Sequence, residues 1–357
     1  DAYSTALKIN SKNTEALIYR SYEYLHESNH EAMINDMLDA FIYGAREKVL
    51  RDLTYLQGQE RIAKALYEGL DKRIKNEPNE YVWNRLAAVL NKQRSNFVDA
   101  IRYYRYDIDK PSRAVSSTLM ADCYMFMGAC KEAVETIDTI KSLTPFNHEL
   151  LHLKLRASGG VGDYDKAILN ASRLIEVAPE LDYGYYVRGL FFRNTNELEK
   201  AVDDFSMAID IAPKASYNYL CRGTIYLSQG KIELANADFN RVIELDNNNP
   251  NSNSVIFAYF YLGNSEEAIK RCEKLLAINN DKGNNYDAAC LYSLLNNKEK
   301  ALDYFEEAME KGYRDFEHLA KDKDLNNIRN ERRFIKIVDK YKSLLNKELK
   351  ATLEEII

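Results

Sequence analysis

Apolar residues recur three and four positions apart along almost the whole chain. The segment Tyr185-x-x-Arg188-Gly189-x-x-Phe192 shows this spacing, and so does the following segment Ala201-x-x-x-Phe205-x-x-Ala208. Such spacing places side chains on one face of an α-helix. The pattern therefore predicts an all-α protein built from short amphipathic helices.

The same pattern returns at a nearly constant interval. Tyr219-x-x-Arg222-Gly223-x-x-Tyr226 follows its counterpart after 34 residues. The six prolines are separated by 33, 34, 34, 34 and 37 residues: Pro78, Pro111, Pro145, Pro179, Pro213 and Pro250. A period of this length indicates a stacked repeat rather than compact domains. We predict that a two-helix unit is copied along the chain and that each proline lies just past a second helix.

The repeated order of aromatic, small and aromatic residues, then alanine, aromatic, alanine and proline, resembles the tetratricopeptide repeat over essentially the whole chain. The resemblance implies a right-handed superhelix of helical hairpins, a solenoid whose units bury their apolar faces by stacking. We expect about eight to nine hairpins over residues 1–313. The first should be truncated and 46–79 degenerate, with helices near 46–56 and 60–75. Residues 314–357 should form capping helices with the apolar stripe Phe334, Ile337, Val338 and Tyr341.

Charge and hydropathy argue against two kinds of partner. The chain has 49 basic and 55 acidic residues, a net charge of −6, so no bulk positive field attracts nucleic acid. The longest apolar stretch, residues 255–262, is less than half of the roughly 20 residues that cross a bilayer, so we expect no membrane insertion. The chain begins at Asp1 without a methionine, and we expect its natural start to lie upstream. Location and oligomeric state stay open, with the cytoplasm as the working expectation.

The candidate chemistry is weak. Asp322-x-Asp324-x-Asn326 has the spacing of a calcium loop, but Asn327 and Arg333 stand where glycine and glutamate are needed. The other candidates lack the partners that their chemistry requires: the pairs His26/His30 and His148/His152, and the run Gly159-Gly160-x-Gly162. We interpret that glycine run as a helix-capping turn. We expect no metal, no cofactor, no catalytic residues and no enzymatic activity. The five cysteines should be apolar core residues.

Three copies share a charged pair sixteen residues apart. The pairs are Arg20/Asp36, Arg188/Asp204 and Arg222/Asp238. Copies without the arginine lack the aspartate as well, as Lys154 and Asn170 illustrate. We predict three structural ion pairs between the paired helices. The alternative is coincidence among solvated surface charges.

The resemblance also implies a partner site, because the first helix of each hairpin would line the concave surface. The positions of these first helices that we expect to be exposed are occupied by Tyr183, Tyr186, Arg193, Tyr217, Phe257, Phe260, Tyr261 and Tyr286. One interpretation is that several of these rings pack between neighbouring helices. The other is that Tyr186, Tyr217, Phe257 and Tyr261 form a ladder for an extended peptide, with Arg193 orienting an acidic group. The chaperone-binding carboxylate clamp of the family is absent from the corresponding places.

Two functions fit these expectations. The first is a non-enzymatic scaffold or adaptor that binds a protein or extended peptide in the concave face. The second is a regulatory or docking arm of a larger enzyme or secretion or envelope complex, whose active part lies outside this sequence. A catalytic domain upstream would favour the second.

Overall fold

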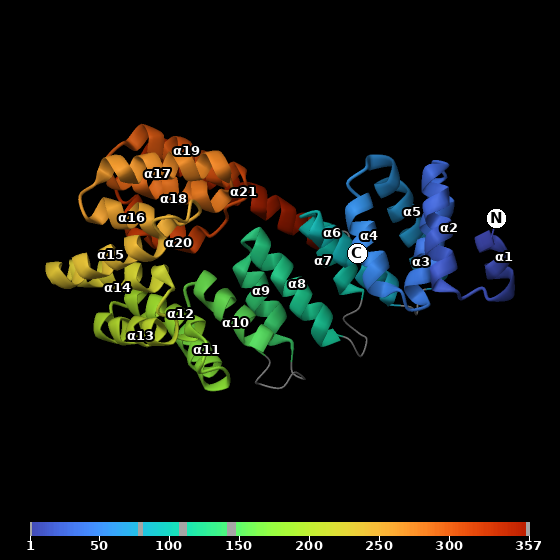
Figure 1. The fold of residues 1–357 in the computed structure, drawn as a ribbon, viewed down its shortest axis with the longest axis horizontal. Helices are drawn as coiled ribbons and strands as arrows, with labels where there is room; N and C mark the ends of the chain where they lie inside the picture. The colour runs from blue at the N-terminus through green and yellow to red at the C-terminus, as the bar shows by residue number, and fades with distance from the viewer. Residues whose placement is uncertain (1, 78–80, 107–112, 141–147, 355–357) are drawn as a thin grey trace. The chain divides into compact units, whose positions relative to one another are not determined.

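Every regular element that the computed structural model describes is a helix (Figure 1). The structure describes residues 2–77, 81–106, 113–140 and 148–354. The chain divides into two compact units, residues 1–123 and 124–353, with the division inside α8 (Arg113–Met127). The all-α prediction is confirmed.

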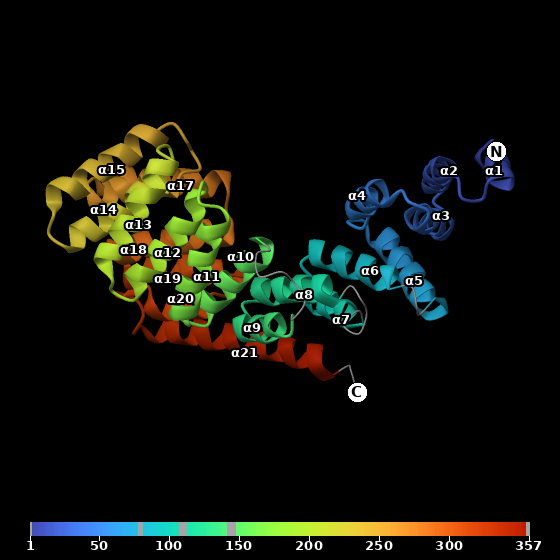
Figure 2. The same ribbon diagram turned by 90° about the horizontal axis from the view of Figure 1, so that it is seen from below.

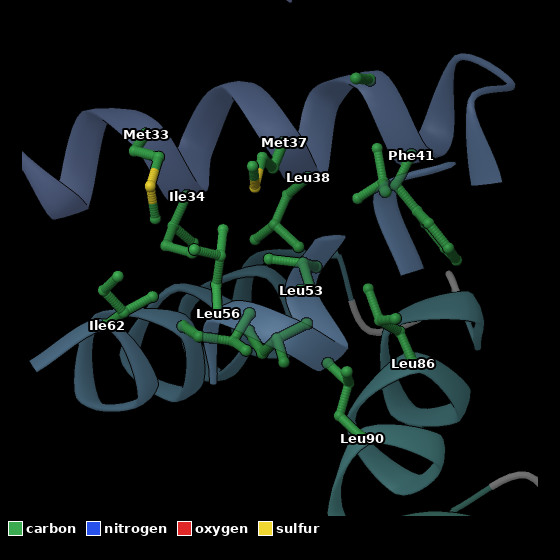
Figure 3. Packing of buried hydrophobic residues seen from close by; sticks show 14 of the residues in the cluster. Met33, Ile34, Met37, Leu38, Phe41, Leu53, Leu56, Ile62, Leu86 and Leu90 are labelled. Carbon is green, nitrogen blue, oxygen red and sulfur yellow. The ribbon is translucent and has the colours of Figure 1, made fainter. Parts of the chain in front are cut away.

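The first unit is a stack of hairpins whose core is continuous from one pair of helices to the next. Its helices are α1 (Ala2–Ile9), α2 (Thr14–His26), α3 (His30–Ile42), α4 (Arg46–Leu56), α5 (Glu60–Asn76), α6 (Val82–Gln93) and α7 (Phe97–Arg105). Figure 3 shows the apolar face of α3 directed toward the next helices, with Met33 above Ile62 of α5, Met37 above Leu53 of α4, and Phe41 above Leu86 of α6. The stretch 46–76 has two regular helices, within one residue of the predicted bounds, although its repeat motif is degenerate.

The second unit continues the hairpins and ends in three further elements. The hairpin helices are α9 (Cys130–Asp138), α10 (His148–Gly160), α11 (Tyr164–Val177), α12 (Asp182–Asn194), α13 (Leu198–Ile211), α14 (Ser216–Ser228), α15 (Ile232–Asp246), α16 (Asn253–Tyr261), α17 (Ser265–Ile278), α18 (Lys282–Leu294) and α19 (Lys298–Glu310). The elements α20 (Phe316–Lys321), η1 (Lys323–Leu325) and the long helix α21 (Arg332–Glu354) follow (Figure 2). No helix in the described ranges is both long and apolar enough to cross a membrane.

Tight turns join the two helices of a hairpin. In several of these turns a residue with positive φ is followed by an asparagine or aspartate that caps the second helix: Gly162 (φ 74°) precedes Asp163, and Asn296 (φ 57°) precedes Asn297. Each cap accepts a hydrogen bond from an N–H of the first helical turn. Gly162 therefore acts as a helix-capping glycine, as predicted. His26 and His30 also lie on either side of such a turn.

Small residues let the paired helices approach closely. A methyl group on Gly189 would lie 3.1 Å from the ring of Phe205, and one on Gly223 only 2.7 Å from the ring of Phe239. Both phenylalanines are fully buried. Pro179 and Pro213 lie just past second helices as predicted, whereas Pro78, Pro111 and Pro145 lie outside the described residues.

Arginine joins three helices in each of three repeats, and this confirms the predicted ion pairs. Arg188 donates from Nε and Nη2 to both carboxylate oxygens of Asp204 at 2.8 and 2.7 Å, and Arg222 binds Asp238 in the same way at 2.9 and 2.8 Å. Arg20 and Asp36 repeat the geometry at 2.7 Å for both bonds. The third arginine nitrogen donates to a serine sixteen residues earlier, and these serines are Ser4, Ser172 and Ser206. We call each set a Ser–Arg–Asp triad.

Each triad is partly shielded from water. The aspartate side chains are 6–7% exposed and the arginine side chains 19–23%. Aromatic rings flank the guanidinium, as Tyr219 and Tyr226 do for Arg222 at 5.8 Å. Bidentate pairs in such surroundings bind more strongly than exposed ones.

The predicted apolar stripe of the last helix is also confirmed. Phe334, Ile337 and Tyr341 are about 5% exposed, and Phe334 stacks on Phe305 at a centroid distance of 4.4 Å. Val338 packs against the same cluster. Helix α21 therefore covers the apolar face of the last hairpin, α18–α19.

Candidate interaction surface

The aromatic residues proposed for the partner site fall into small groups rather than one row. Tyr186 and Tyr217 meet edge to face at 4.7 Å, and Tyr183 stacks on His152 at 5.0 Å. The hydroxyl of Tyr217 donates to Asp182. Burial raises the pKa of Tyr186 well above its ordinary value. Tyr186 therefore lies largely between helices, while Tyr217 keeps 37% of its surface.

The later aromatic residues lie mostly against the core. Phe257 and Phe260 are half-buried beside the clusters around α18, and Tyr261 stacks on Phe239 at 5.1 Å. Tyr286 is only 5% exposed, because Tyr313 stacks on its ring at 4.2 Å. Among these four, Tyr261 alone lines a described cavity.

The chain after the last hairpin returns across the unit to much earlier repeats. We call residues 313–325 the return segment. Arg314 abuts Gly128, Glu317 abuts Gly162, and Lys321 Nζ lies 4.6 Å from the ring centroid of Tyr164. The return segment thus touches the turns of two hairpins that precede it by more than 150 residues of sequence. The return segment closes one side of the space between the repeats.

A first cavity of about 580 Å³ lies between the return segment and three repeats. It is lined by residues of α12, α14 and α16 on one side, among them Arg193, Thr224 and Tyr261, and by His318 and Asp324 on the other. The side chain of Arg193 forms no hydrogen bond or ion pair with the residues that the structure describes. Cavities of this size hold small molecules or a few peptide side chains.

A second cavity of about 540 Å³ adjoins the first, and Tyr164, Arg193, Asn194 and His318 line both. Its other walls come from α8, α10, α12, the start of α18 and the first residues of the return segment. Arg193 and His318 therefore stand at the junction of the two cavities.

Titratable groups hold the return segment to α18. Tyr286 donates to Asp322, the thiol of Cys290 lies 3.6 Å from the same carboxylate, and His318 Nε2 lies 3.4 Å from it. Burial alone would raise the pKa of Asp322, but His318 and the Tyr286 hydroxyl lower it to about 2.

The pKa values of two neighbouring carboxyl groups are shifted in the opposite direction, upward. Burial raises the pKa of Asp287 to about 7, and the charges of Asp322 and nearby aspartates add to the effect. Burial and Asp322 raise the pKa of Asp324 to about 6. The side chain of Asp287 accepts a hydrogen bond from Asn253 and has no cationic partner among the described residues.

Asp322, Asp324 and Cys290 bring two carboxylates and a thiol within 4.8 Å of one another. The sequence motif Asp322-x-Asp324 thus lies beside a cysteine that is 32 residues earlier in the chain. Because Tyr286, Cys290 and His318 already contact the Asp322 carboxylate, we interpret the cluster as a hydrogen-bonded joint between α18 and the return segment.

A third cavity, of about 220 Å³, lies where α9, α10 and α11 meet. Asp138, Lys154 and Asn170 line it. These residues lie 34 positions before Ser172, Arg188 and Asp204, so they occupy the place of a Ser–Arg–Asp triad. The cavity therefore marks a repeat in which the triad is missing.

Comparison with known proteins agrees with the hairpin stack. The sequence profile named Tetratricopeptide repeat matches residues 218–249 and 284–310. A tetratricopeptide repeat protein from Parabacteroides merdae superposes with a TM-score of 0.51, covering 76% of this chain and 98% of its own at 17% identity. The chain therefore contains tetratricopeptide repeats. At that identity the structural likeness establishes the fold of the repeat protein and nothing more.

Other similarities cover less of the repeat protein. A MamA structure from Desulfovibrio magneticus RS-1 covers 47% of this chain and 96% of its own, with a TM-score of 0.45 and 19% identity. A chloroplastic protein of Arabidopsis thaliana is 36% identical over 76 residues, which are 20% of this chain and 23% of that protein. The repeat protein thus matches less than a quarter of that relative's length.

Sequence reasoning singled out Asp322 and Asp324 only for their calcium-like spacing and did not place them at a cavity, and it proposed no role for His318 and Arg314. They lie beyond the last repeat, where no periodicity assigns them to a face. It also missed the serines of the triads, although a sixteen-residue step backward from each arginine would have found them.

Proposed function

We propose that this repeat protein is a scaffold that holds an extended segment of a partner protein in the joined cavities between its repeats and its return segment. Tetratricopeptide repeats form protein-interaction scaffolds, and the family match supports that general role. The observation that carries the proposal is Arg193. Its charged group lies at the junction of two cavities and has no partner among the described residues.

The cavity walls suit a peptide. Tyr261 offers an aromatic surface, and Thr224 and Asn194 offer polar groups to a main chain or side chain. Arginine and tyrosine are the residues that most often dominate binding at protein surfaces. In this proposal Arg193 orients an acidic group of the partner, and the half-buried Tyr261 with the exposed Tyr217 supplies the rings of the aromatic ladder. Tyr186, Tyr183 and Phe257 pack against core clusters of the repeats and have no direct role in this proposal.

The test uses the full chain and a phage-displayed library of random dodecapeptides. Each peptide is fused at the N-terminus of the coat protein, so none has a free C-terminal carboxylate. Selected peptides are resynthesised and their Kd values are measured by fluorescence anisotropy against the wild type and against Thr224→Trp, which fills the first cavity. We expect the variant to weaken binding at least tenfold, about 1.4 kcal/mol.

The matched control is Asn240→Trp, which adds the same side chain at an exposed position of α15. It should leave the Kd unchanged within about twofold. Equal melting curves for both variants would show that neither perturbs the fold. If the library yields no binders, or if Thr224→Trp binds the selected peptides as well as the wild type does, the proposal is wrong.

A further inference from the structure

The second cavity is basic although the whole chain is acidic. Its lining includes Arg156, Arg193, Lys282 and Arg314, with His318 at the junction and Asp315 as the one acidic residue of the lining. The chain as a whole carries a net charge of −6. Four of the chain's cationic side chains thus meet in one concave place, where low-dielectric walls strengthen their field.

The acidic residue in this lining is already engaged. Asp315 caps helix α20, accepting a hydrogen bond from the N–H of His318 at 3.0 Å. Arg314 Nη1 donates to the carbonyl oxygens of Met309 and Tyr313, at 2.5 and 2.8 Å, and Lys282 Nζ lies 3.5 Å from the carbonyl oxygen of Gly312. No carboxylate contacts these two cations among the described residues. Burial lowers the pKa of Arg314, the direction expected for a cation whose charge is poorly compensated.

The same cavity also has a substantial apolar surface. Met125, Leu190 and Phe191 contribute aliphatic and aromatic walls, and Phe126, also in the lining, keeps 41% of its surface exposed. An anion alone would leave this surface in contact with water. A bulky apolar side chain beside acidic groups would cover it and neutralise the surrounding cations.

We propose that the second cavity binds a partner segment in which a bulky apolar residue is flanked by aspartates or glutamates. The apolar side chain enters between Met125, Leu190 and Phe191, and the flanking carboxylates reach Arg156, Arg193 and Lys282. This inference rests on the proposed scaffold function and adds the chemistry of the partner. The cations come from three helices, α10, α12 and α18, and from the return segment, and they do not occupy equivalent positions of successive repeats.

The composition of the peptides selected in the preceding experiment tests the charge preference. We expect aspartate and glutamate to be enriched on both sides of leucine, phenylalanine or tryptophan, and lysine and arginine to be depleted, relative to the unselected library. Selected peptides that still require an open first cavity but show no acidic enrichment would overturn this inference while leaving the scaffold function standing. Absence of any binders would instead count against the scaffold function.

Charge reversal locates the site. Arg156→Glu/Lys282→Glu should weaken binding of an acidic selected peptide at least tenfold, and Lys282→Glu alone, at an exposed position, should weaken it about threefold. The control Lys214→Glu/Lys274→Glu makes the same change in net charge at exposed positions outside the cavities and should change the Kd less than twofold. Equal weakening by both double variants would mean that only the overall charge matters, and the site assignment would be wrong. The single variant keeps the test valid if the double variant melts early.

Discussion

The hairpin α12–α13 and the hairpin α10–α11 place different side chains at the same meeting point of three helices. Around α12, Arg188 joins Ser172 to Asp204 and fills the space between them. Around α10, Lys154 stands between Asp138 and Asn170, forms no ion pair with the described residues, and leaves a cavity of about 220 Å³. The backbone hairpin forms in both places. The comparison shows that the repeat fold needs the small and aromatic core positions. The triad is an addition that fills the space between three helices and joins them.

The largest expected effect comes from breaking a triad. Asp204→Ala leaves Arg188 partly buried without its carboxylate, and we expect the free energy of unfolding of the second unit to fall by about 2–3 kcal/mol. The neighbouring Asp203→Ala removes an exposed carboxylate from the same helix and should change it by less than about 0.5 kcal/mol. Unfolding in guanidinium chloride, monitored by circular dichroism, measures the free energy of unfolding of both variants. Similar midpoints for the two variants would show that the triad contributes little.

A smaller effect should follow from installing the triad where it is missing. Asp138→Ser/Lys154→Arg/Asn170→Asp should raise the free energy of unfolding by about 1 kcal/mol, because arginine can bind the new carboxylate with two hydrogen bonds and fill the cavity. Asn170→Asp alone is the control and should give no gain, since a lysine ammonium cannot form that bidentate pair. A triple variant less stable than the wild type would show that the place does not accept the triad geometry.

The pH dependence of stability separates the two kinds of buried aspartate. Asp287 lacks an arginine, and its pKa is raised to about 7, so the folded state binds a proton that the unfolded state has lost. The free energy of unfolding should therefore rise as the pH falls from about 8 towards 5. The raised pKa values of Asp324 and His318 act in the same direction. Asp287→Asn should flatten this slope in melting curves recorded across the window, and an unchanged slope would contradict the assignment.

The smallest expected effect concerns the serine. Ser206→Ala removes the hydrogen bond of 3.0 Å from Arg222, and with it the bond that the serine hydroxyl donates to the carbonyl oxygen of Val202, while the carboxylate pair remains; we expect a loss of about 0.5–1 kcal/mol. Ser206, on the helix of the preceding hairpin, and Asp238 bind the same guanidinium, that of Arg222. The double variant Ser206→Ala/Asp238→Ala should therefore be less destabilised than the sum of the two single variants. Strict additivity would indicate that the serine and the aspartate act independently.

The sequence predicted what local spacing along a helix determines and little of what depends on contacts between distant segments. Helix bounds near 46–56 and 60–75, the Arg188/Asp204 type of pair and the buried stripe of Phe334 all follow from local spacing, because helix geometry converts spacing into contact. Tyr286 could not be assigned in this way. Its burial depends on Tyr313, which belongs to the return segment, and no periodicity relates that segment to α18. The division of the chain into an array of hairpins over residues 1–313 and capping helices beyond it stays a prediction.

The triad also says something about how such a chain can grow. Helix α13 carries Asp204 and Ser206 two positions apart, the first bonded to the arginine of its own hairpin and the second to the arginine of the next. A unit with this Asp-x-Ser helix and an arginine on its first helix is self-complementary. When its gene segment is duplicated in tandem, every new boundary acquires a complete triad without any further mutation. One duplication would then both lengthen the array and form the triad at its new boundary. Duplication of the unit around Lys154 would instead duplicate its cavity.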